Sequence, residues 1–385
     1  MRTGIVGGVL LAAGLVAVLF GVLPASDAAT LAARVAPILV FVVAMTLVTE
    51  LAAEADLFGY LAERAARWAG GRAWVLWLLT LILSVLSTVF LSLDTTAVLL
   101  TPVIVLLARH AGLPPLPFAL LTVWMANTAS LLLPVSNLTN LLAEQVLPGY
   151  TPLAFAALMA APALVAILIP AAVLAYLHRR ELTRRFIPAE PAPIQDRVLF
   201  IAAAITIAVL LPLLVSGLPV WIPALACACV LVGFFAVRRP GVLTGRLVPW
   251  SLVLFAGGLF LVVETAHALG LGEFLAAASG TGHDPLSLLR LAGVGAFGAN
   301  AINNLPAYLA LEPTAGDPVR IAALLIGVNV GPLITPWASL ATLLWHRRLV
   351  SLNVQLSWRR YCALGLLVAP VTVAAATVAL VTTLG

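Results

Sequence analysis

The chain has 385 residues, of which 63% are apolar and only 9% carry a charge. In soluble domains roughly a quarter of the residues are charged, so this composition excludes an ordinary soluble protein and predicts an all-α, polytopic membrane protein. The formal net charge is +5, and the basic residues are arginines. We take their placement as a signal of orientation in the membrane and not of nucleic-acid binding.

The first half of the chain contains long apolar runs with two polar interruptions. Residues 4–23 predict a retained first span, 24–34 a loop, and 35–55 a second span. Residues 63–72 predict a short amphipathic segment at the membrane interface. The following elements are two arms joined as a hairpin over 72–109, a broken segment over 116–148, and a span over 152–177.

The second half repeats this order after a polar stretch at 178–197. The expected elements are spans over 197–216, 219–237 and 249–267, a short segment over 271–279, a hairpin over 285–313, a broken segment over 318–346, and a terminal span over 359–382. We therefore divide the chain into an N-terminal span and loop (1–33), a first repeat (34–185), a linker with two connecting spans (186–245) and a second repeat (246–385).

The arginines predict the orientation. If each hairpin begins and ends on one side, the chain makes nine full crossings, and its termini lie on opposite sides. With a cytoplasmic N-terminus, the only arginines outside are Arg34, Arg290 and Arg320, as the positive-inside rule requires. The C-terminus is then outside. The parity is the same whether the arms form re-entrant hairpins or pairs of full crossings.

An internal repeat is visible as identities under shifts of 214 and 202 residues. The matched pairs include Phe41 with Phe255, Glu50 with Glu264, Asn127 with Asn329, and Pro134 with Pro336. Asp94 falls near Asn303 at an intermediate shift. Because the first copy begins with a span running inward and the second with one running outward, the repeat is inverted. This arrangement is typical of a secondary transporter with its site near the membrane midplane.

Each broken segment contains a proline among polar residues. Pro134 and Pro336 remove a helix hydrogen bond and are expected to unwind the helix locally. Unwound backbone in a membrane must be buried in protein or line a polar cavity. Candidate substrate- or ion-binding residues at the two breaks are Asn127, Ser136, Asn137, Thr139, Asn140, Asn329, Thr335, Ser339 and Thr342. The alternative is that these side chains only bond neighbouring helices.

Asp94 is a carboxylate between two apolar arms. Its charge at the membrane centre would cost roughly 2.5–3.5 kcal/mol, so we expect it to bind a cation, exchange a proton or lie in water. In the alternative interpretation it is neutral and caps the next arm, beside Thr95 and Thr96.

Other chemistries find no support in the sequence. It contains neither a nucleotide-binding loop nor zinc-ligand spacing, and its Ser, His and Asp residues do not cluster as a catalytic triad. Cys227, Cys229 and Cys362 lie in apolar segments, which predicts neither a disulfide framework nor a metal site. We therefore expect no enzyme activity, no catalytic residues, no metal and no cofactor.

Four segments carry a resemblance to a known family. LDTTAVLLTP, NTASLLLPVSNLTNLL, INNLP and GPLITPWASLATLLWHRRL resemble segments of bacterial arsenite and antimonite efflux permeases of the ion transporter superfamily. The resemblance implies inverted repeats, each with a re-entrant hairpin and a broken helix, and an elevator-like transport domain. It places Asp94, Thr95 and Thr96 at one hairpin tip, and Asn303 and Asn304 at the other.

The chain also departs from related carriers. Sodium-coupled dicarboxylate carriers of similar fold usually have a Ser-Asn-Thr triplet at each tip, and neither tip here has one. The departure argues against their sodium sites and their substrate clamp.

The function implied is extrusion of arsenite or antimonite across the bacterial inner membrane, by proton antiport through Asp94 with alternating access. The alternative is a sodium- or proton-coupled transporter of another small anion, such as a dicarboxylate or sulfate. The expected partners are the small inorganic solute, protons and membrane lipid. A soluble ATPase docked on the loop 178–197 and a second copy of the chain are further candidates, and no nucleic acid is expected.

Overall fold

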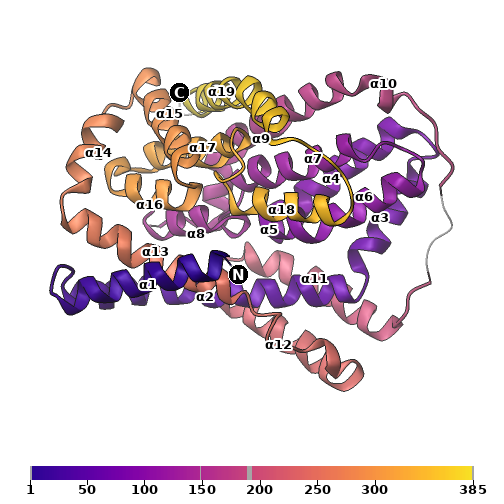
Figure 1. Ribbon diagram of the computed structural model, residues 1–385, viewed down its shortest axis with the longest axis horizontal. Helices are drawn as coiled ribbons and strands as arrows, with labels where there is room; N and C mark the ends of the chain where they lie inside the picture. The colour runs from indigo at the N-terminus through magenta and orange to yellow at the C-terminus, as the bar shows by residue number, and fades with distance from the viewer. Residues whose placement is uncertain (1, 148, 189–192, 384–385) are drawn as a thin grey trace.

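The structure, a computed structural model, describes residues 2–147, 149–188 and 193–383, and within these ranges it is almost entirely helical (Figure 1). Eight helices in the described part of the chain are long and apolar enough to cross a membrane. An 18-residue helix such as α4 rises about 27 Å, close to the thickness of the hydrocarbon layer. The expected all-α polytopic membrane fold is therefore confirmed.

The first half follows the expected order of elements. Its helices are α1 (Arg2–Leu19), α2 (Ala25–Glu54), α3 (Leu57–Trp68), α4 (Ala73–Phe90), α5 (Leu93–Thr95), α6 (Thr101–His110), α7 (Leu116–Thr128), α8 (Leu138–Gln145), α9 (Pro152–Leu177) and α10 (Arg179–Leu182). The expectation of a loop over 24–34 was wrong, because α2 already begins at Ala25. That stretch is rich in alanine and carries Asp27 in its first turn, and both features favour a helix start.

The second half repeats the layout. Its helices are α11 (Arg197–Leu214), α12 (Trp221–Arg238), α13 (Trp250–Ala268), α14 (Leu271–Ser279), α15 (Pro285–Ala301), α16 (Asn304–Ala315), α17 (Pro318–Val330), α18 (Leu340–Ser351) and α19 (Trp358–Thr382). The first hairpin is thus α4 with α5 and α6, and the second is α15 with α16. The broken helices are α7 with α8 and α17 with α18.

The helices form two layers (Figure 1). We call α1, α2, α11, α12 and α13 the base layer; the hairpins, the broken helices, α9 and α19 form the upper layer. Within the base layer α1 packs on α13, and α12 packs on α2. The shift of 214 residues matches α2 with α13, and α1 and α12 are the helices that precede them. The α1–α13 and α12–α2 contacts are therefore counterparts under the repeat.

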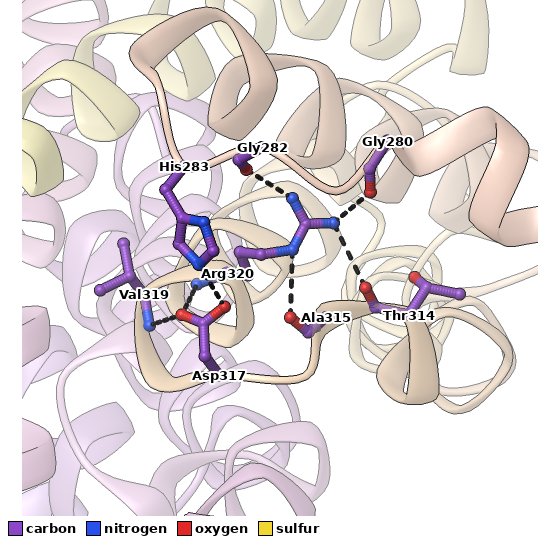
Figure 2. A network of polar contacts seen from close by, with 8 residues as sticks. All are labelled: Gly280, Gly282, His283, Thr314, Ala315, Asp317, Val319 and Arg320. Carbon is purple, nitrogen blue, oxygen red and sulfur yellow. Dashed lines mark hydrogen bonds and ion pairs between the residues drawn. The ribbon is translucent and has the colours of Figure 1, made fainter.

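The loops beside the second hairpin are fastened by a buried arginine (Figure 2). The Arg320 side chain is 2% exposed and donates to four backbone carbonyls, those of Gly280, Gly282, Thr314 and Ala315, at 2.5–3.2 Å. A buried guanidinium is tolerated where its donors are satisfied in this way. Arg320 thereby joins the α14–α15 loop to the end of α16. We refer to this end of the molecule as the Arg320 end.

A close helix contact in the upper layer lies between α15 and α17. A Cβ added at Gly327 would come within 2.1 Å of the Ala292 carbonyl oxygen, so the two backbones approach each other only because this residue has no side chain.

We expect Gly327→Ala to lower the free energy of unfolding by about 1–3 kcal/mol, because α17 must move away from α15. The measurement is thermal or denaturant unfolding in detergent. Gly293→Ala on α15 is the matched control, because its added Cβ would meet nothing within 4 Å, and a shift under about 0.5 kcal/mol is expected there. Equal stability of the two variants would contradict the close packing.

Candidate functional site

The two hairpin tips share an unusual backbone conformation. Ser92, between α4 and α5, has φ 139°, and Asn303, between α15 and α16, has φ 156°. Each side chain accepts a backbone N–H of the following helix, from Thr95 at 3.2 Å and from Leu305 at 3.3 Å. Non-glycine residues in this region are strained, and such strain clusters at functional sites. Ser92 is therefore the structural counterpart of Asn303.

Both tips border one cavity of about 290 Å³. Its walls come from α2 and α13 of the base layer and from both hairpins and both broken helices of the upper layer. The polar or charged lining residues are Thr46, Thr49, Glu50, Ser92, Asp94, Thr95, Asn137, Ser251, Asn303, Asn304, Ser339 and Arg347. A pocket at the meeting point of two repeats, with converging polar groups, is the expected form of a transport site.

Six of the residues predicted from the sequence line this cavity: Asp94, Thr95, Asn137, Asn303, Asn304 and Ser339. The other predicted residues do not line it; they are Thr96, Asn127, Ser136, Thr139, Asn140, Asn329, Thr335 and Thr342. Thr335 bonds to Asn300, with its hydroxyl 2.8 Å from the Oδ1 atom. The rest are buried; Thr96 bonds within the first hairpin, and the others make their contacts at the two breaks.

The first break is an interrupted stretch of 3-10 helix. Leu133, which precedes Pro134, is extended at φ −125° and ψ 152°, as a residue before proline prefers. The carbonyls freed there are satisfied by side chains: Asn140 Nδ2 donates to the Ser130 and Leu133 carbonyls at 2.7 and 3.1 Å, and the Ser136 hydroxyl donates to the same two. This supplies the hydrogen bonds that the membrane cannot.

Asn329 joins the second broken helix to the first. Its Oδ1 accepts from Asn137 Nδ2 at 2.7 Å and from the Thr139 hydroxyl at 3.1 Å, and its Nδ2 donates to Asn140 Oδ1 at 2.9 Å. The residue is 1% exposed. We call Asn137, Thr139, Asn140 and Asn329 the carboxamide cluster.

A second side-chain hydrogen bond joins the two broken helices, and here the donor lies on the first broken helix. Asn127 Nδ2 donates to the Thr342 hydroxyl at 3.3 Å. Under the shift of 202 residues, Asn127 corresponds to Asn329 and Asn140 to Thr342. The Asn127–Thr342 and Asn329–Asn140 bonds are therefore counterparts, and each repeat holds the break of the other.

Asp94 lies half-buried at the first tip and lines the cavity. In the part of the chain that the structure describes, no hydrogen bond or ion pair involves its carboxylate. The alternative that it caps the next arm is wrong, because Ser92 is the capping residue. Thr96 turns away from the cavity and bonds Ser87 and Thr88 of the other arm, at 2.9 and 2.8 Å.

Ser339 presents an unpaired hydroxyl at the cavity. It stands at the start of α18 as Asn137 does at the start of α8, but among the described residues its hydroxyl makes no capping bond. The Ser339 Oγ atom is buried with no hydrogen-bond partner in the described part of the chain, and the residue lines the cavity. A buried unsatisfied hydroxyl is costly, and a bound solute would relieve that cost.

Sequence reasoning missed the cavity residues on the base layer. Met45, Thr46, Thr49 and Glu50 lie on one face of α2, at the helical spacing that could have shown them together. Arg347 on α18 was treated only as part of a positive cluster that marks orientation. We call the end of the molecule where Glu50 and Arg347 lie the Arg347 end.

The second tip is fastened to the second break. Asn303 Nδ2 donates to the Trp337 carbonyl, and the Asn304 backbone N–H donates to the Ala338 carbonyl, both at 2.8 Å. These bonds make the second hairpin and the second broken helix one unit. Within the described residues no group of three or more His, Cys, Asp or Glu could hold a metal ion.

Comparison with known proteins agrees with this architecture. The citrate transporter family profile matches residues 4–342. An arsenical pump membrane protein of Yersinia enterocolitica is 33% identical over 355 residues, covering 84% of this chain and 81% of that protein. One of Escherichia coli is 30% identical over 349 residues, with the same shares covered. The crystal structure of the Alcanivorax borkumensis YdaH transporter shares the fold, with TM-score 0.57, 18% identity, and 94% and 90% of the two chains covered.

We expect Asn329→Ala to destabilise the protein by about 3 kcal/mol, because three buried partners lose their hydrogen bonds. Asn303→Ala, which removes only the bond to Trp337 and the cap of α16, is the comparison and is expected to cost about 1 kcal/mol. Unfolding in detergent measures both. If Asn329→Ala is as stable as the wild type, the carboxamide cluster does not hold the breaks.

Proposed function

The chain belongs to the family of citrate transporters and arsenical pump membrane proteins, and we propose that it extrudes arsenite or antimonite across the bacterial inner membrane in exchange for protons. Like its relatives, the chain is a membrane transporter and not an enzyme. The observation that carries the choice of solute is the set of uncharged polar groups that the hairpin tips present to the cavity beside Asp94, together with the Ser339 hydroxyl, which has no partner among the described residues.

The chemistry of arsenite suits these groups. At neutral pH it is largely the uncharged trihydroxide, and each of its hydroxyls both donates and accepts a hydrogen bond. The amide of Asn304 and the hydroxyl of Ser339 supply both kinds of partner. Such a solute carries no net charge into the membrane.

A second candidate, a small anion such as citrate, is favoured by the family profile and by Arg347. The guanidinium of Arg347, however, is exposed at the rim of the cavity, whereas the tip itself carries the carboxylate of Asp94. Asp94 and an anionic substrate would repel each other in the low-dielectric interior. We therefore place the neutral trihydroxide first.

Asp94 is the residue proposed to exchange the proton. Asp94 lines the cavity, and its carboxylate has no hydrogen-bond or ion-pair partner among the residues that the structure describes, so substrate and proton can compete for the same group. Extrusion against a gradient needs such coupling, and an acid in the membrane interior is the usual site for it.

The orientation we propose follows from the arginines. Glu50 lies near the end of α2, Ser251 lies in the first turn of α13, and Arg347 lies on α18, so the cavity borders the Arg347 end. Most arginines belong on the cytoplasmic side, which places the N-terminus and this mouth inside and the C-terminus outside. The structure then represents an inward-open state. The division into two layers supports alternating access by movement of the upper layer along the base layer.

In cells that lack their own arsenite efflux system, we expect this protein to lower arsenite accumulation and Asp94→Asn to abolish the effect while still reaching the membrane. Asp27→Asn, an exposed carboxylate at the start of α2, is the control and should behave as the wild type. If Asp94→Asn still extrudes arsenite, Asp94 is not the coupling residue. Unchanged accumulation with the wild type would favour the anion carrier.

Ser339→Ala should raise the arsenite KM about 2- to 12-fold, the equivalent of one hydrogen bond of 0.5–1.5 kcal/mol. Because Ser339 Oγ has no protein partner, stability should be unchanged or slightly improved. Transport in everted vesicles and unfolding in detergent provide the two readouts. A loss of stability with an unaltered KM would assign Ser339 a structural role.

A further inference from the structure

The base layer meets the upper layer differently at its two ends. At the Arg347 end, the halves of α2 and α13 nearest that end border the cavity. At the Arg320 end, the same two helices are covered by α8 and α16. The passage is therefore open on one side of the membrane and closed on the other.

An ion pair lies on the closed side. Arg34 of α2 contacts Glu312 of α16, with Nη2 and Oε1 2.5 Å apart, and the same nitrogen lies 3.4 Å from the Leu142 carbonyl of α8. The Glu312 side chain is 9% exposed and that of Arg34 32%. The pair thus joins the base layer to the second hairpin and to the first broken helix.

The surroundings of this pair also link the layers. His267 of α13 lies with its Nε2 atom 3.1 Å from the Ala310 carbonyl of α16. The hydrogen bonds of Arg320 fasten the end of α16 to the α14–α15 loop (Figure 2). Helix α16 therefore cannot move away from the base layer without this loop. Movement of the upper layer relative to α2 would therefore have to separate Arg34 from Glu312.

The open side carries the complementary charges without a bond between them. Glu50 of α2 and Arg347 of α18 line the same cavity, and in the described residues Glu50 forms no ion pair. Helix α2 thus presents a cation to the upper layer at the Arg320 end and an anion at the Arg347 end. The upper layer presents the opposite sign at each place: Glu312 at the Arg320 end, and Arg347 with its neighbour Arg348, whose charge acts on Glu50, at the Arg347 end.

We propose that these charges form two alternating gates. In this state the Arg34–Glu312 pair closes the outer side. In the opposite state Glu50 pairs with Arg347 and closes the inner side. The inference rests on the alternating access proposed above, and it goes beyond it by naming the residues that set the balance between the two states. Each gate is a contact between the base layer and the upper layer, so only one can be closed at a time.

The test measures which side of the membrane reaches the cavity. The three natural cysteines are replaced by serine, and Val98→Cys is introduced in the cavity wall of the first hairpin, which belongs to the upper layer. A membrane-impermeant maleimide added to intact cells then labels this cysteine only when the cavity opens outward.

We expect Glu312→Gln to raise outside labelling roughly threefold or more, because the closed outer gate loses its ion pair. Glu273→Gln, an exposed carboxylate on the neighbouring helix α14, should leave labelling at the background level. The exchanged pair Arg34→Glu with Glu312→Arg should return labelling toward that background, which a loss of folding could not do. Labelling of Glu312→Gln equal to background would overturn the outer gate.

The inner gate is tested in the same background. The double variant Glu50→Gln, Glu312→Gln loses one ion pair in each state. Its outside labelling should therefore fall back toward that of the protein with both gates intact. If Glu50→Gln leaves the labelling of Glu312→Gln unchanged, Glu50 is not the inner gate.

The gates and the choice of solute fail separately. A labelling shift in a protein that does not lower arsenite accumulation would refute arsenite extrusion and leave the gates in place. Arsenite extrusion with labelling unaffected by Glu312→Gln and by Glu50→Gln would refute the gates alone.

Discussion

The structure depends on one constraint: backbone that unwinds inside a membrane must find its hydrogen bonds within the protein. Two helices are interrupted here, and side chains of the same repeat satisfy the freed carbonyls: Asn140 and Ser136 at the first break, and Asn300 at the second. Side-chain bonds then join the two repeats, from Asn329 to Asn140 and from Asn127 to Thr342. These bonds across the repeat interface hold the two breaks at one point. The hairpin tips with Ser92 and Asn303 meet at this point.

Few polar groups remain available to a solute. Carboxamides and hydroxyls that face the other repeat are hydrogen-bonded within the protein, whereas Asp94, Asn304 and Ser339 face the cavity. A site with one unpaired carboxylate, an orphaned hydroxyl and amides offers a neutral polyhydroxyl solute many partners. It offers an anion only the arginine at its rim. The chemistry of the cavity thus supports the arsenical branch of the family over the citrate branch.

Much of this arrangement could be predicted from residues that have purely local effects. Pro134 and Pro336 interrupt helices wherever they stand, and the order of apolar runs and arginines predicts spans and repeats. The roles of individual polar residues could not be predicted, since Asn137 and Asn140 differ only in which neighbour each one meets in the folded protein. The loop expected before Arg34 is helical because alanine-rich sequence continues a helix beyond the apolar run. Only the folded structure brings Glu50 and Arg347 to one cavity.

We propose that arsenite and protons move in a coupled manner through a site that contains Asp94. The purified protein in proteoliposomes with an imposed pH gradient tests this coupling, with arsenite uptake and internal pH followed together. We expect arsenite accumulation in the acidic interior, faster dissipation of the gradient when arsenite is present, and neither effect with citrate. Arsenite movement that ignores the gradient, or a gradient-driven flux of citrate in its place, would contradict this proposal.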